Sequence, residues 1–189
     1  ILGSIKNIRH QVSVDDNVLV YYAGHGLVDP DTNEGFWLPV DADREDESNW
    51  LLTDRVRSQI KVMLAKHVLV VADSCFSGKF TRSATRGFTI DPDATGYVPA
   101  LRRLAAKRSR TVLTSGGLEP VFDSIGNSKH SVFAKAFLSL LNANMRVLDA
   151  ARLSHKVRSE VISYSSQTPE YGPIPEGGHD GGDFLFVRK

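Results

Sequence analysis

The chain has 189 residues, 41% of them hydrophobic, which is enough for one domain with a sizeable core. Its 23 basic and 22 acidic residues leave a net charge of +1, so composition gives no indication of a nucleic acid or a membrane as partner. No apolar stretch reaches the length of a membrane span, and the first residues lack a signal-peptide pattern. The single cysteine excludes an internal disulfide and fits a reducing compartment, so we expect a cytoplasmic protein.

The first half of the sequence predicts two strands joined through a helix. Apolar residues at helical spacing predict a helix over residues 1–12, and 18–23 reads as a strand that is apolar on both faces. A helix follows from Thr53-Asp54 to about Lys66, and then a strand at 68–72. A right-handed crossover of this kind makes the strands parallel and brings their carboxyl ends to one edge of the sheet. The intervening segment is expected to hold a turn at 29–35, a short strand at 36–40 and an acidic loop at 41–47.

The second half adds one loop and several regular elements. Residues 79–98 lack periodicity and are rich in Thr, Ser, Gly, Pro and Arg, which predicts a mobile loop. The elements expected after it are a helix at about 99–107, a strand at 111–114, helices opened by Ser131 and Asp149, a Pro- and Gly-rich loop over 167–182 and a last strand over 184–187. We therefore expect an α/β fold with a mostly parallel sheet flanked by helices on both faces.

Each of the two parallel strands ends in a small-residue turn that carries one reactive side chain. Tyr22-Ala-Gly-His-Gly26 places His25 after the first strand, and Asp73-Ser-Cys-Phe-Ser-Gly78 places Cys75 after the second. Sites in open α/β sheets lie beyond the carboxyl ends of the strands, so we expect one reaction centre. Taken singly, either residue is more often a packing residue, but their joint placement favours catalysis.

The chemistry expected of this pair is nucleophilic catalysis. An imidazole lowers the pKa of a nearby thiol or takes its proton, and it can later protonate a leaving amine. The backbone N–H groups of Gly26 and Cys75 are candidates for an oxyanion hole. The glycines on either side of His25 are expected to let a substrate backbone approach closely.

These motifs resemble the caspase-like cysteine peptidases and, among them, the metacaspases and their bacterial relatives. The resemblance continues through Leu113-Thr-Ser-Gly-Gly117, Gln167-Thr-Pro169 and Gly182-Asp-Phe-Leu-Phe186, so it covers nearly the whole chain. It implies a caspase-like sandwich with His25 as general base and acid and Cys75 as nucleophile. It also implies a single peptidase domain over 1–189, made of a large-subunit-like part at 1–78, a mobile and cleavable loop at 79–98 and a small-subunit-like part at 99–189.

The same resemblance suggests the substrate. Asp73 lies two residues before the cysteine, and the matching aspartate of metacaspases lines the pocket for the side chain before the scissile bond. A carboxylate there attracts Arg or Lys and repels Asp. Glu119 resembles the second acidic wall of that pocket, and the caspase signature Gln-Ala-Cys-Arg/Gln/Gly-Gly is absent. We expect cleavage after Arg or Lys; the alternative for Asp73 is a turn residue that caps the following helix.

Basic residues directly after the cysteine suggest self-processing. Lys79, Arg82 and Arg86 lie in the predicted loop, and caspase-like enzymes often mature by a cut between the two parts of the domain. These three residues are candidate self-cleavage sites. The alternative is that they are solvated charges on a loop.

No metal cofactor is expected. Asp29, Asp31 and Asn33 mimic the opening of a calcium loop, but the glycine comes one place late and no Glu closes the loop, so turn chemistry is the better interpretation. Some metacaspases need calcium, which leaves calcium activation open with weak support. Four histidines have no metal-ligand spacing with the lone cysteine, which argues against zinc: His67, His130, His155 and His179.

The sheet of the resembling family has two further strands and a helix before the strand that matches 18–23. Without them this strand would be an apolar sheet edge, so we expect an N-terminal segment or a second chain to complete the sheet. The other expected partners are a protein or peptide substrate and a regulatory protein.

Two other functions stay open. The first is a catalytically silent caspase-like binding or regulatory module, against which the intact His and Cys argue. The second is another thiol acyl-transfer enzyme such as an amidase, against which the absent Gly-x-Ser-x-Gly elbow and the order of His before Cys argue.

Overall fold

The computed structural model describes residues 1–43, 46–74, 96–116 and 130–188. A four-stranded sheet lies at its centre, and β1, β5 and β6 run parallel while β8 is antiparallel to β6. In order across the sheet the strands are β1 (Asn17–Ala23), β5 (His67–Asp73), β6 (Ser109–Thr114) and β8 (Glu170–Pro173). The predicted α/β fold with a mostly parallel sheet is confirmed.

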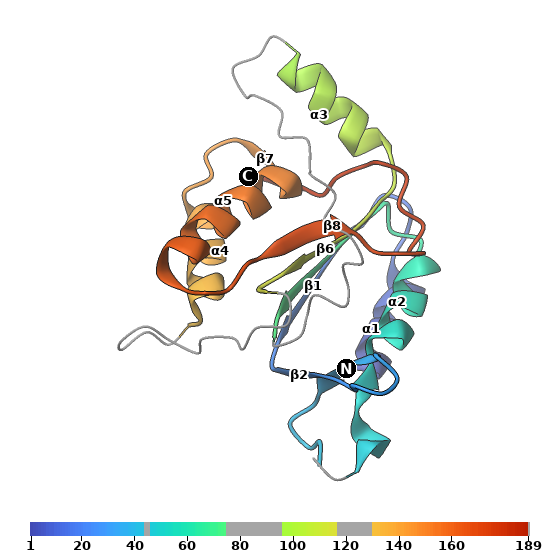
Figure 1. Ribbon diagram of the computed structural model, residues 1–189. Coiled ribbons are helices and arrows are strands. Elements are labelled where there is room, and N and C mark those ends of the chain that lie inside the picture. Colours follow the sequence, from blue (N-terminus) through green and yellow to red (C-terminus); the bar gives the residue numbers. More distant parts are fainter. Residues whose placement is uncertain (44–45, 75–95, 117–129, 189) are drawn as a thin grey trace.

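Helices cover both faces of this sheet (Figure 1). On one face lie α1 (Leu2–Gln11) and α2 (Thr53–Lys61), and on the other α4 (Val132–Asn142) and α5 (Ala150–Tyr164). The remaining helix, α3 (Tyr97–Ala106), leads into β6. No helix of the described ranges is long and apolar enough to cross a membrane.

The sequence of β5 accounts for this double cover. Val68, Val70 and Ala72 pack in the cluster with α1 and α2, whereas Leu69 and Val71 pack in the cluster with α4 and α5. Successive side chains of a strand point to opposite faces, so a strand covered on both sides needs an uninterrupted apolar run. Every residue of β5 is buried.

β1 differs from this pattern. Val18 and Tyr22 are buried on the face covered by α1 and α2, but Leu19 and Tyr21 on the opposite face are 43% and 40% exposed. The strand is apolar on both faces in a sheet covered by helices on both sides, as predicted, but the second face of β1 is only partly covered. Among the described residues β1 pairs with β5 alone, so it is the edge strand of the sheet.

Two smaller sheets complete the fold. A three-stranded antiparallel sheet follows β1, and a two-stranded ribbon joins the end of the chain to the start of α5. The strand predicted over 184–187 thus pairs in the ribbon and not in the central sheet. The elements are β2 (His25–Val28), β3 (Gly35–Leu38), the 3-10 helix η1 (Glu47–Asn49) and β4 (Leu51–Leu52), and then β7 (Val147–Asp149) with β9 (Leu185–Val187).

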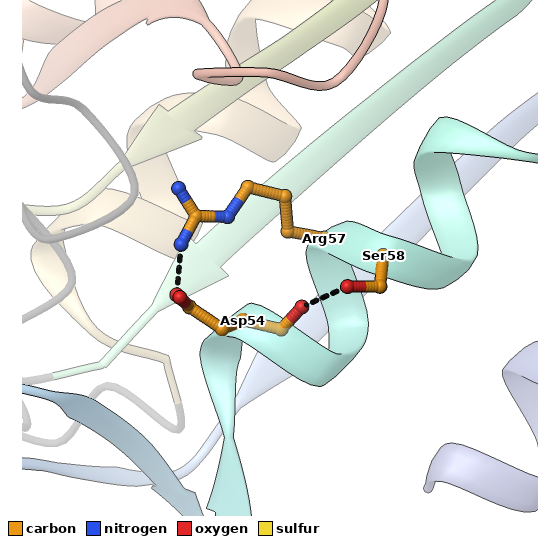
Figure 2. Close-up of polar contacts among 3 residues, drawn as sticks. All are labelled: Asp54, Arg57 and Ser58. Carbon is orange, nitrogen blue, oxygen red and sulfur yellow. Dashed lines mark hydrogen bonds and ion pairs between the residues drawn. The ribbon is translucent and has the colours of Figure 1, made fainter.

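Helix starts agree with the sequence because their signals are local. The Ser131 hydroxyl accepts a hydrogen bond from the N–H of Ala134 (2.9 Å), and a carboxylate oxygen of Asp149 accepts one from Arg152 (2.8 Å). Figure 2 shows the start of α2, where Asp54 pairs with Arg57 and its carbonyl accepts a hydrogen bond from the Ser58 hydroxyl (2.8 Å). An exposed ion pair of this kind adds little stability.

Two loop predictions need correction. The loop predicted for 79–98 ends earlier, because α3 begins at Tyr97; residues 79–95 lie outside the described part of the chain. β8 lies within the predicted loop 167–182. Gly172 and Pro173 made this segment read as a loop, because both residues are rare in strands. Proline is tolerated here because β8 is an edge strand, where a residue can lack an N–H to donate.

The end of α2 was also predicted five residues too late, and a distant arginine explains why. Arg110 on β6 is fully buried, and its guanidinium donates five hydrogen bonds of 2.7 to 3.1 Å to backbone carbonyls. Four of these carbonyls belong to the end of α2 and the turn after it: Ile60, Met63, Ala65 and Lys66. The planar five-donor fork of arginine suits this role. Burial, and then the charge of Arg108, lower the Arg110 pKa to about 10, so the group stays charged at neutral pH.

We therefore expect Arg110→Met to destabilise the fold strongly. The apolar side chain fills the space but leaves buried carbonyls without donors, which costs about 3 kcal/mol or more of unfolding free energy. Urea unfolding followed by circular dichroism measures the loss. Arg102→Met, at an exposed position of α3, is the matched control and should shift the free energy by less than about 0.5 kcal/mol. Equal effects of both substitutions would contradict this role of Arg110.

Candidate functional site

The carboxyl ends of the parallel strands meet at one edge of the central sheet. Each residue of β1 pairs with the residue fifty positions later in β5, from Asn17 with His67 to Ala23 with Asp73. The Gly24 N–H extends this ladder by donating to the Asp73 carbonyl (3.3 Å). His25 and Cys75 have the same separation, so each lies two residues beyond the last pair. Cys75 is outside the described residues, and its contact with His25 stays a prediction.

The neighbouring strand β6 contacts the residue before the cysteine. The Ser115 N–H donates to the Ala72 carbonyl (2.9 Å), and the Ser115 hydroxyl donates to the Ser74 carbonyl (3.4 Å). Both serines are buried. Ser74 is the last described residue before Cys75, whose N–H is the predicted oxyanion donor, so Ser115 contacts the chain directly before the predicted nucleophile. Sequence analysis noted the motif around Ser115 but gave the residue no role.

His25 is the first residue of β2, where the sequence predicted a turn at 24–26. It pairs with Leu38 of β3, and its side chain is exposed. The prediction missed this strand because its pairing depends on β3, which follows only after the turn at 29–35. Placement on a paired strand gives His25 a more rigid backbone than a free turn would give it.

Tyr22 holds the backbone at this point. Its hydroxyl donates to the carbonyl of His25 (2.7 Å) and to that of Leu38 (3.1 Å). Its ring stacks on Trp37 with a centroid distance of 4.1 Å and an interplanar angle of 7°. Burial raises the Tyr22 pKa to about 12, so the phenol remains a donor. Sequence analysis missed this residue; the available signal was a tyrosine in an apolar strand, whose buried hydroxyl needs a partner.

Asp73 lies at the end of β5 and is 7% exposed. Its Oδ2 accepts hydrogen bonds from the hydroxyls of Ser131 (2.5 Å) and Tyr21 (3.4 Å). Burial first, and then the charge of Asp73, raise the pKa of Tyr21 well above its ordinary value, so it too remains a donor. Asp73 therefore contacts the start of a helix, as the alternative interpretation proposed. The helix is α4, reached through its cap residue Ser131, and the sequence did not reveal this contact.

A cavity of about 1050 Å³ lies beside His25. It is lined by residues at the end of β1 and in the β2–β3 hairpin and, after the hairpin, by Val40, Asp43 and Trp50. A cleft of this size next to a reactive side chain is where a ligand is expected to bind.

The structure does not test the remaining predicted site residues. Glu119 and the predicted cleavage residues Lys79, Arg82 and Arg86 lie outside the described residues.

The calcium-like segment is a turn. One carboxylate oxygen of Asp29 accepts the N–H groups of Asp31 (2.7 Å) and Thr32 (3.2 Å), and these bonds lower the Asp29 pKa. The side chain is thus used by its own backbone, as in an Asx turn. In the part of the chain that the structure describes, no three His, Cys, Asp or Glu side chains are grouped to hold a metal ion.

Comparison with known proteins supports the same fold. A family model described as Caspase domain matches residues 2–175. The crystal structure of protein GSU0716 from Geobacter sulfurreducens superposes with a TM-score of 0.54 at 15% identity, over 95% of this chain and 75% of that one. At this identity the likeness concerns the fold alone. No curated protein matches the chain significantly.

Proposed function

Because the chain belongs to the caspase domain family, we propose that it is a cysteine endopeptidase with His25 and Cys75 as its catalytic dyad. The family is one of cysteine peptidases and includes inactive members. The observation that carries the proposal is the register of β1 and β5, which puts both residues two positions beyond one strand pair. The register is set by the fold, so the test of activity depends on the two side chains themselves.

The proposed reaction has two halves. His25 takes the Cys75 thiol proton, and the thiolate sulfur attacks the substrate carbonyl carbon to form a tetrahedral oxyanion. The N–H groups of Gly26 and Cys75 stabilise that oxyanion, with Ser115 contacting the chain directly before Cys75. His25 then protonates the leaving amine as the C–N bond breaks. In the second half His25 activates a water molecule that hydrolyses the thioester and returns the proton to sulfur.

We propose that the substrate residue before the scissile bond is Arg or, less often, Lys. The supporting observation is the position of the Asp73 carboxylate, which lies at the same sheet edge as His25 and accepts hydrogen bonds from two hydroxyls. Glu119 is the proposed second acidic group. The cavity beside His25 is large enough for a peptide segment. The proposed reaction uses no metal ion, so calcium could act only as an activator and not as a catalytic cofactor.

A cleavage profile of the purified protein on a peptide library tests this proposal. We expect cleavage after Arg, with Asp73→Asn lowering kcat/KM for Arg substrates about 10- to 100-fold, since a charge-assisted contact is lost. Cys75→Ala and His25→Ala are the inactive controls. The profile should not change when calcium is added or chelated.

Two outcomes would contradict the proposal. Cleavage after Asp and not after basic residues would show that the pocket is wrongly assigned. A wild-type protein no more active than Cys75→Ala would favour the alternative, a catalytically silent caspase-like binding module.

We further propose that the enzyme cuts its own chain after Lys79, Arg82 or Arg86. The support is their position directly after Cys75 in a sequence without regular periodicity. Intact-mass spectrometry should find two fragments in the wild type and none in Cys75→Ala. The same fragments in both proteins would indicate an outside protease instead.

We also propose that β1 has a second strand neighbour, supplied by another segment of the full-length protein or by a second chain. The support is its apolar sequence and its pairing with β5 alone among the described strands. Hydrogen exchange of the native protein should find the β1 amides protected on both edges. Fast exchange of every second β1 amide would contradict the proposal.

The other proposed partners are a protein or peptide substrate and a regulatory protein, in the cytoplasm, where a lone cysteine stays a thiol. Co-purification from cell lysate followed by mass spectrometry tests for these partners, and fractionation tests the compartment.

A further inference from the structure

We propose that Tyr22 is a positioning residue for His25. Its hydroxyl fixes the first residue pair of the β2–β3 hairpin, and with it the backbone that carries the imidazole. The inference rests on the proposed peptidase function, in which His25 moves the protons. Tyr22 also lines the cavity beside His25, but its hydroxyl is engaged by two backbone carbonyls and contacts no reacting atom.

The contacts place the Tyr22 hydroxyl at one end of the hairpin ladder. His25 and Leu38 are register partners in the antiparallel pair of β2 and β3. The phenol O–H donates to the carbonyls of both, at 2.7 Å to His25 and 3.1 Å to Leu38. One proton shared between two carbonyls holds these two strand ends together.

The tyrosine is itself held rigidly. It lies on β1 of the central sheet, is 8% exposed, and stacks almost parallel on Trp37, which is 1% exposed. Trp37 comes from β3, so ring and hydroxyl both connect the central sheet to the small sheet that carries His25. A buried stack with these distances leaves the phenol little freedom to follow a displaced backbone.

Gly24 gives an independent sign that this packing is close. A Cβ added at Gly24 would lie 2.8 Å from the Tyr22 hydroxyl oxygen and 3.0 Å from its Cζ. The φ angle of Gly24 is not in the left-handed region, so its backbone would accept an alanine. The glycine before His25 is therefore required by the Tyr22 side chain, whereas sequence analysis assigned it to the approach of a substrate.

The expected consequence is kinetic. Loss of the hydroxyl removes the donor that joins the His25 and Leu38 carbonyls, so the start of β2 is free to shift. A displacement of about 1 Å at a catalytic group can cost about 100-fold in rate. Substrate contacts at Asp73 are unaffected, because Tyr22 and Asp73 lie on opposite faces of the sheet edge.

Tyr22→Phe tests the inference on an Arg peptide substrate. We expect kcat to fall about 10- to 100-fold while KM stays within about twofold of the wild type. Tyr97→Phe is the matched control, because it also removes a tyrosine hydroxyl that donates to a distant backbone carbonyl, that of Val147 (3.0 Å). Its kcat should equal that of the wild type.

Gly24→Ala gives a second, coupled variant. It should lower kcat as well, and the double substitution with Tyr22→Phe should lower kcat by less than the product of the two single effects, because the alanine methyl and the hydroxyl compete for one space. Multiplicative effects would indicate that Gly24 and Tyr22 act separately, against this packing role.

A measurement that does not depend on activity separates the positioning role of Tyr22 from the proposed peptidase function. In Tyr22→Phe, NMR should show faster amide exchange in the hairpin at residues 25–28, and this exchange should be unchanged in Tyr97→Phe. Unchanged hairpin exchange with wild-type kcat would overturn the role of Tyr22. If Tyr22→Phe changes the hairpin exchange but the wild-type protein cleaves no substrate, Tyr22 still positions the His25 backbone and the peptidase function is rejected.

Discussion

The parallel pairing of β1 with β5 is the constraint on which the rest of the structure depends. The ladder runs without a bulge over seven residue pairs and keeps an offset of fifty positions throughout. Because β5 is buried on both faces, a slip of one residue would turn its apolar side chains toward the wrong helix pair. The register is thus fixed by the core, and the core in turn fixes where the chain leaves the sheet after Ala23 and after Asp73.

The carboxyl end of β1 shows how this register positions side chains. Tyr21 and Tyr22 are adjacent on β1 and point to opposite faces, as successive strand residues do. The Tyr21 hydroxyl donates a hydrogen bond to the carboxylate of Asp73, and the Tyr22 hydroxyl donates one to the carbonyl of His25. Two neighbouring residues of one rigid strand therefore contact both the proposed specificity group and the backbone of the proposed base. This is the kind of support that a precisely placed catalytic group needs from the residues around it.

The sequence was sufficient where the signal is local. The apolar runs of β1 and β5 and the caps at Ser131 and Asp149 identify strands and helix starts without knowledge of the fold. The placement of His25 beyond the end of β1, at the edge where β5 also ends, followed from the parallel crossover alone, and that of Cys75 stays a prediction. These predictions need only the pattern of neighbouring residues.

The sequence was insufficient where a distant residue decides. α2 ends at Lys61, and the backbone carbonyls after it accept hydrogen bonds from Arg110 instead of continuing the helix. Lys61 and Arg110 are almost fifty residues apart in the sequence. β2 and β8 are short strands with Gly or Pro, and they exist only because β3 and β6 pair with them. The contact of Ser131 with Asp73 joins a helix cap to a strand end far away in the chain, which no periodicity reveals.

We propose above that His25 and Cys75 form one reaction centre beside an acidic pocket. The most direct measurement is covalent labelling by an electrophilic Arg-peptide probe, with the labelled residue identified by mass spectrometry. The account predicts a stoichiometric adduct on Cys75 in the wild type, much slower labelling in His25→Ala, and no competition by an Asp-peptide analogue. Failure to label Cys75, or equal labelling rates with and without His25, would contradict it.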